Sequence, residues 1–92
     1  KIHAFNSKNI GLYFLSPYTE FRTDDGTATF YHSLFDKSVT FEIRDNTSME
    51  RFIDSIGQGT DEPMCLSLIC KAFKSENPSD VLISLMQTGI IE

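Results

Sequence analysis

The residue types that carry out catalysis are present in this chain, but they form no recognisable catalytic constellation. Asp24 and Asp25 could act as paired carboxylates in acid–base chemistry. They directly precede Gly26, however, and Asp-Gly between two strand-like runs is typical of a tight hairpin turn. His32 alternates with apolar residues along a strand-like run, which favours a hydrogen-bonded histidine on an inward face over a general base. We therefore interpret these residues as structural.

The candidate metal ligands are two cysteines and two histidines. Cys65 and Cys70 lie five positions apart in a helix-like segment, on different faces and too far apart for an unstrained disulfide. His3 and His32 have no Cys or His neighbours at the spacing of a zinc site. The pattern predicts two buried, reduced thiols, as in a cytoplasmic protein, and neither a metal nor a cofactor.

Sequence motifs of common enzyme classes are missing from the chain. There is no G-x-S-x-G elbow, no P-loop, no G-x-G-x-x-G and no H-E-x-x-H. The glycine-containing stretch 57–59 suits the end of a helix better than a phosphate-binding loop. We therefore expect that this domain has no catalytic residues and is not itself an enzyme.

The charge balance argues against nucleic acid as a partner. The chain has 92 residues, which is enough for one domain with a single core. It includes 13 acidic and 8 basic residues, for a net charge of −5. Nucleic-acid affinity comes mainly from neutralising phosphates, and no Lys or Arg lies between positions 78 and 92. No apolar run approaches the ~18–20 residues of a membrane span, so a membrane is not expected as a partner either.

Residues 18–43 have the pattern of three sequential strands. The runs are "YTEFRT" at 18–23, "TATFYHSL" at 27–34 and "SVTFEI" at 38–43, separated by the Asp-Gly turn and by "FDK". Thr, Val, Ile, Phe and Tyr, which suit a pleated surface, are common in these runs. Tight turns between sequential strands predict an antiparallel meander with one covered face.

After residue 43 the apolar spacing changes from that of a strand to that of a helix. Three helices are expected, each preceded by capping residues. The first begins near Ser48 and ends at 57–59, the second has Thr60 as its cap, and the third has Asn77 as its cap and ends at Gly89. The methionines at 49, 64 and 86 fall on apolar helical stripes and are expected in the core.

Strands followed by helices indicate an α+β fold, with helices packed on a small sheet. We expect one domain over residues 18–92, and residues 1–17 as an N-terminal extension or an edge strand. The chain begins with Lys1, as expected for a processed or disordered N-terminus or a piece of a longer protein.

Four segments between Tyr18 and Glu92 are similar to those of one known family. They are the strand "SVTFEI", the joint "RDNTS", the helix end "FIDSIGQGT" and the last helix "PSDVLISLMQTGIIE". These segments resemble the PqqD-like domains of ribosomal peptide natural-product (RiPP) biosynthesis, called RiPP recognition elements. The chain departs from the family at Gly57-Gln58-Gly59, where the family commonly has an Asp-Gly turn.

The resemblance implies a winged-helix-like domain, a three-stranded antiparallel sheet followed by three helices, that binds the leader region of a precursor peptide. The peptide would add a strand beside the third strand, in the groove next to the third helix. The domain would thereby deliver the peptide to a modifying enzyme, which is either a separate protein or fused to the domain. The implied peptide-binding residues are Ser38, Val39, Thr40, Phe41, Glu42 and Ile43 on the strand and Val81, Leu82, Leu85 and Met86 on the helix, with Thr88 as a further candidate. Arg44 and Arg51 are candidates for pairing with acidic peptide residues.

Two other functions stay open from the sequence. The same architecture also serves winged-helix nucleic-acid-binding regulatory domains, and a structural N-terminal domain of a RiPP-modifying enzyme would have the same pattern. A homodimer through the open edge of the third strand is a further expectation, because an unpaired strand edge can pair with its own copy.

Overall fold

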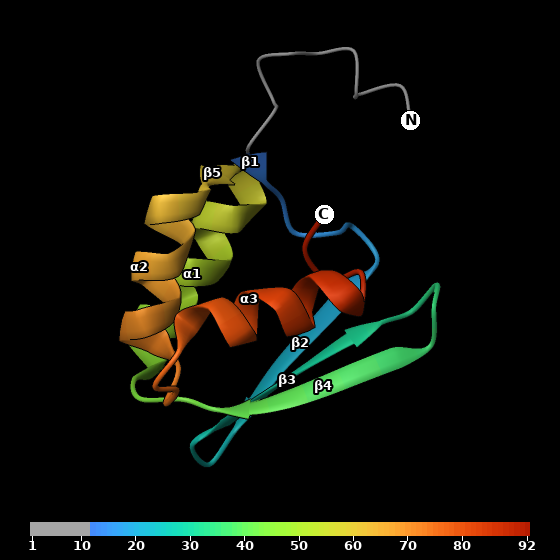
Figure 1. Cartoon of the computed structure of the whole chain (residues 1–92). Helices are drawn as coiled ribbons and strands as arrows, with labels where there is room; N and C mark the ends of the chain where they lie inside the picture. The colour runs from blue at the N-terminus through green and yellow to red at the C-terminus, as the bar shows by residue number, and fades with distance from the viewer. Residues whose placement is uncertain (1–11) are drawn as a thin grey trace.

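A computed structural model describes residues 12–92 of the chain. Its elements, shown in Figure 1, are β1 (Leu12–Tyr13), β2 (Thr19–Asp24), β3 (Thr27–His32), β4 (Lys37–Glu42), α1 (Asn46–Gln58), β5 (Thr60–Asp61), α2 (Glu62–Ala72) and α3 (Pro78–Gln87). The predicted α+β fold, a three-stranded antiparallel sheet followed by three helices, is confirmed. The sequence did not predict the short second sheet of β1 and β5.

The three-stranded sheet has the order β2-β3-β4. Its first hairpin turns at Asp25 and Gly26, whose φ angles of 46° and 83° are the positive values that a two-residue type I′ turn requires. The predicted Asp-Gly turn is thereby confirmed. The second hairpin turns over residues 33–36, where Asp36 also has a positive φ, of 55°.

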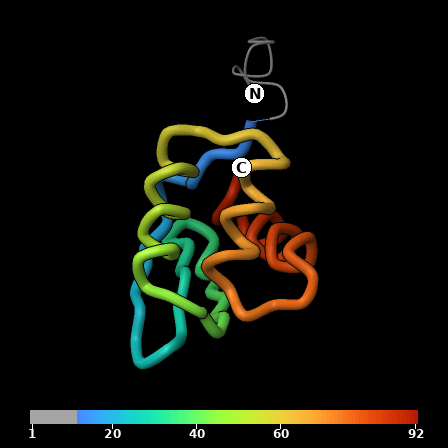
Figure 2. Tube along the Cα trace, turned by 90° about the vertical axis from the view of Figure 1, so that its left-hand side faces the viewer, coloured from blue at the N-terminus to red at the C-terminus, as the bar shows by residue number. Residues whose placement is uncertain are grey.

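The helices cover one face of this sheet. Along β3, Ala28, Phe30 and His32 are buried, whereas the residues between them are half-buried on the opposite face. Figure 2 shows α3 on the β4 side of the sheet and α1 toward the β2 side. The sheet therefore has an apolar inner face and a polar outer face, as is common in antiparallel sheets.

Phe73, the first residue after α2, lies in the centre of the core and is only 1% exposed. Its ring centroid lies 5.2 Å from that of Phe41 on β4, 5.4 Å from that of Phe52 on α1 and 6.3 Å from that of Phe30 on β3. One side chain thus connects two strands with a helix. The core also contains buried residues from all three helices and the C-terminal segment: Met49, Ile56, Cys65, Ile69, Ala72, Val81, Leu82, Leu85, Ile90 and Ile91.

The N-terminal part of the described chain is tied to the rest by main-chain hydrogen bonds. β1 pairs antiparallel with β5, and Phe14 exchanges two hydrogen bonds with Glu92, of 3.0 and 2.8 Å. Ser16 N donates to Ile90 O at 2.8 Å. The sequence predicted residues 1–17 to be an N-terminal extension or an edge strand. Residues 1–11 lie outside the described residues, and residues 12–16 pack with the domain.

The helix starts differ from the predicted ones at two of three positions. Asp45, rather than a residue near Ser48, caps α1 and accepts a hydrogen bond from Ser48 N at 2.9 Å. Thr60 does not cap α2, because it pairs with β1 as part of β5, and Asp61 takes that role. The predicted cap of α3 by Asn77 is confirmed.

Candidate functional site

β4 is an outer strand and pairs with β3 on one side only. Ile43 N, just after β4, donates to Gly26 O at 2.9 Å. In an antiparallel ladder the main-chain groups of successive residues point alternately to either side, so those of Val39 and Phe41 point toward β3. The main-chain groups of Ser38 and Thr40 therefore point outward. Their N–H groups can donate hydrogen bonds to another strand, and their carbonyl oxygens can accept hydrogen bonds from it.

One end of this outer edge is closed by the segment 72–74. Ile43 and Phe73 form an antiparallel bridge, Lys74 N donates to Glu42 O at 3.0 Å, and Arg44 N donates to Ala72 O at 2.8 Å. The segment acts as a short extra strand on β4. The open part of the edge is consequently the first part of β4.

A groove of about 200 Å³ lies next to this edge, between β4 and α3. Phe41 and Val81 supply its apolar surface. Lys74, Glu42 and Asp80 supply charged groups, and Phe73, Ser75 and Ser84 complete the lining. A groove of this size and composition can hold an apolar side chain of an extended peptide with polar groups on either side.

The strand residues implied by the resemblance divide between the two faces of the sheet. Val39 and Phe41 are half-buried and pack against the core, and Ile43 is buried. Ser38, Thr40 and Glu42 are exposed, in register with outer-face residues of β3. The strand is an outer strand of the sheet, and of its six implied residues only Phe41 and Glu42 line the groove.

The implied helix residues are not all brought to the groove. Val81 lines it, whereas Leu82 and Leu85 are buried in the core and do not. Met86 is 44% exposed and does not line the groove either. Of the three methionines expected in the core, Met49 is buried but Met64, like Met86, is exposed, so the prediction is wrong for these two.

The three further candidates have other surroundings. Thr88 Oγ1 donates to Ser84 O and Leu85 O, both at 3.1 Å, at the end of its own helix. Arg44 Nε donates to Phe73 O at 2.9 Å, which fixes its side chain over the closed end of the edge. Arg51 is exposed on α1 and is not part of the groove lining.

Several groove residues were missed by the sequence analysis. Asp80 and Ser84 flank Val81 at the i−1 and i+3 positions of α3, so that all three share one helix face beside the apolar stripe. This spacing was a signal that could have identified them. Lys74 and Ser75 come from the connection between α2 and α3, for which the sequence pattern gives no position. Phe73 fits the end of the apolar stripe of the second helix, but it lies one residue beyond α2.

His32 faces inward and is hydrogen-bonded, as predicted. It is 2% exposed, and its Nδ1 accepts a hydrogen bond from Phe35 N at 3.1 Å. Its Nε2 lies 3.2 Å from Ser16 Oγ. Because Nδ1 is an acceptor, Nε2 holds the proton and donates to Ser16. In this arrangement His32 cannot remove a proton from Ser16, and the pair is not an activated nucleophile.

The two thiols have different environments. Burial, with a smaller effect of the Glu62 carboxylate, raises the pKa of the Cys65 thiol to about 11. Cys70 is free and exposed, so the prediction of two buried thiols is wrong for this residue, which lies on the outer face of α2. Within residues 12–92 no cluster of His, Cys, Asp and Glu could hold a metal ion, and no helix is long and apolar enough to cross a membrane.

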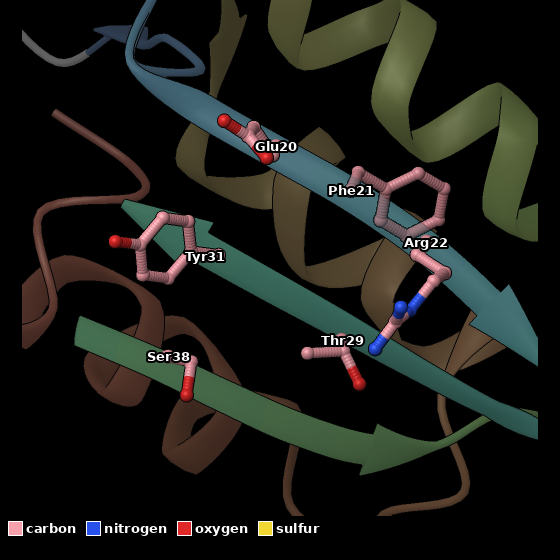
Figure 3. A pocket seen from close by; sticks show the side chains of 6 residues that line it. All are labelled: Glu20, Phe21, Arg22, Thr29, Tyr31 and Ser38. Atoms are coloured by element: carbon pink, nitrogen blue, oxygen red, sulfur yellow. The ribbon is translucent and has the colours of Figure 1, made fainter. Parts of the chain in front are cut away.

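A second, larger hollow lies on the outer face of the sheet (Figure 3). It measures about 400 Å³ and is lined by Glu20, Phe21, Arg22, Thr29, Tyr31 and Ser38. Tyr31 donates its hydroxyl to Asp36 Oδ1 at 2.9 Å, and this hydrogen bond raises the pKa of the tyrosine. This polar hollow lacks the helical wall that the groove beside β4 has.

Comparisons with known proteins identify no relative. No family model, curated protein or solved structure matches the chain.

Proposed function

We propose that this domain is noncatalytic and binds the leader region of a ribosomally synthesised precursor peptide as an added strand on β4. The observation that supports the proposal is the open edge at Ser38 and Thr40 beside the groove between β4 and α3. Main-chain hydrogen bonds to the edge would supply affinity, and the groove would select side chains. The bound peptide would be delivered to a modifying enzyme, in trans or fused, in the cytoplasm.

The position of the groove limits which part of the peptide it meets. An added strand alternates its side chains between the two faces of the sheet. Those on the inner face would enter the groove near Phe41 and Val81, and those on the outer face would lie beside Thr40. The segment 72–74 occupies the end of the edge and would stop the peptide there. Holding the peptide raises its effective concentration at the enzyme.

Titration with leader peptides encoded near the gene, followed by fluorescence polarisation, tests the proposal. The decisive variant is Thr40→Pro, which removes an outward N–H and leaves the main-chain bonds between β3 and β4 intact, although it also removes the exposed hydrogen bond between the Thr29 and Thr40 hydroxyls. We expect it to weaken binding on the order of tenfold or more, because a main-chain hydrogen bond is lost and the proline ring obstructs the added strand.

Thr23→Pro is the matched control. Asp24 and Thr27 close the two-residue hairpin, so the main-chain groups of Asp24 point toward β3. Because successive residues of a strand point to opposite sides, the N–H of Thr23 points away from β3. It lies on the outer edge of β2, at the opposite side of the sheet from β4. This variant should bind like the wild type. Failure of every neighbouring leader peptide to bind would overturn the proposal in favour of a structural domain. Tight duplex binding with a steep salt dependence would overturn it in favour of nucleic-acid binding.

A further inference from the structure

β2 forms the other outer edge of the sheet, opposite the proposed peptide site. The main-chain groups of successive residues along β2 point alternately toward β3 and away from it, and those of Asp24 at the hairpin point toward β3. Those of Thr19, Phe21 and Thr23 therefore point away from β3. Thr19 N donates to Ser16 O at 3.1 Å. Within residues 12–92, no main-chain hydrogen bond engages the outward groups of Phe21 and Thr23. These groups can therefore pair with a further strand.

The charges on β2 restrict how such a strand can align. Glu20 and Arg22 lie on the outer face of the sheet (Figure 3), in register with Tyr31 and Thr29 of β3. Two antiparallel β2 strands centred on Phe21 would set each Glu20 opposite Arg22 of the other strand. A register centred on Arg22 would oppose two arginines, and one centred on Glu20 would oppose two glutamates. Opposite charges facing each other across a sheet are stabilising and like charges are not.

We propose that two copies of this chain pair through β2 in the antiparallel register centred on Phe21. The two Phe21 residues would exchange a pair of main-chain hydrogen bonds. Each Thr23 N–H would donate to Thr19 O of the other copy. The hydrogen bond to Ser16 uses the N–H of Thr19, so the carbonyl oxygen of Thr19 is available to accept. The half-buried Phe21 rings would meet on the inner face, beside the rings of Phe30 that they already contact.

The alternative, pairing through β4, has only the first part of that strand available. The segment 72–74 occupies the edge next to Glu42 and Ile43, whereas no described segment pairs with the outer side of β2. Pairing through β2 follows a two-fold axis and joins the two sheets into one, with β4 at either end. Peptide binding on β4 and self-association on β2 are thus independent, and either can hold without the other.

Sedimentation velocity over a wide range of protein concentrations tests the pairing. The wild type should form dimers as the concentration rises. Glu20→Arg and Arg22→Glu each turn two attractive contacts into two repulsive ones, so each should weaken the dimer about tenfold or more. The double variant Glu20→Arg/Arg22→Glu restores both attractive contacts with the signs exchanged, and should return the dissociation constant to near the wild-type value.

Backbone variants locate the interface, with circular dichroism confirming that each remains folded. Thr23→Pro should abolish the dimer, and Thr40→Pro on β4 should leave it unchanged. The proposal is overturned if the wild type stays monomeric at every concentration, if the double charge exchange fails to rescue the single variants, or if Thr40→Pro rather than Thr23→Pro dissociates the dimer.

Discussion

Ile43 and Phe73 face each other in an antiparallel bridge at the point where β4 leaves the sheet. The bridge has two consequences. It holds the main chain of residues 72–74 against the edge of β4, which closes one end of that edge and places Phe73 and Lys74 in the groove lining. It also fixes the Phe73 ring between strands and helix, edge-on to the rings of both Phe41 and Phe52. Phe73 therefore belongs both to the core and to the candidate site.

Replacement of Phe73 by alanine is expected to be strongly destabilising. The ring is buried and contacts three other aromatic rings, so its removal should lower the free energy of unfolding by about 3–5 kcal/mol. Phe35→Ala provides a control with the same chemical change at a 55% exposed position and should cost about 1 kcal/mol or less. Urea denaturation measures both, and equal losses would contradict the central role of Phe73.

The groove can be filled without changing the core. Ser84 is half-buried and lines the groove, so Ser84→Trp should occupy the space that a peptide side chain needs and reduce leader-peptide affinity on the order of tenfold or more. Ile83→Trp places the same side chain one position earlier, at a site that is 50% exposed and away from the groove lining. It should bind peptide normally. Fluorescence polarisation distinguishes the two, and similar affinities would argue against this groove.

The main features of the fold could be predicted because they depend on local signals. Asp25 and Gly26 specify a turn through backbone conformation, the alternation along β3 specifies its buried face, and Asn77 with Pro78 specifies the start of α3. β1 and β5 could not be predicted, because strands of two residues have no periodicity and form only through their contact with each other.

The candidate site was only partly predictable for a related reason. An apolar stripe shows which face of α3 is inward but not which of its residues meet the sheet, other helices or a groove. Leu82 and Leu85 fill the core, whereas the groove lies along the adjoining face with Val81 and Ser84. The contribution of Phe73 arises from a bridge between distant segments, which no local pattern indicates.

The cap of α1 should make stability depend on pH in the acidic range. The hydroxyl and the main-chain N–H of Ser48 both donate to Asp45, and these bonds lower the pKa of the carboxyl below its ordinary value. A carboxyl whose pKa is lower in the folded state stabilises the fold above its unfolded-state pKa, and this contribution is lost as the pH falls through the folded-state pKa.

Asp45→Asn tests this contribution, because asparagine is also a good helix cap but does not titrate. The difference in unfolding free energy between wild type and variant should be largest near neutral pH. It should shrink below about pH 4, where the aspartate of the unfolded chain becomes protonated. Urea denaturation of both proteins across this range measures it, and a difference that stays constant with pH would rule out a stabilising charge at the cap.

Two glycines near the end of α1 should respond to alanine in opposite ways. Gly57 lies within the helix, and a Cβ added there would meet no atom within 4 Å, so Gly57→Ala should stabilise the protein by about 0.5–1 kcal/mol.

Gly59 has a φ of 99°, and an added Cβ would overlap the ring of Phe14, with 2.7 Å to its Cζ. Gly59→Ala should therefore destabilise by more than about 1 kcal/mol. Thermal unfolding should show a raised midpoint for the first variant and a lowered one for the second. A neutral Gly59→Ala would mean that the packing of the β1 segment on this turn is looser than described.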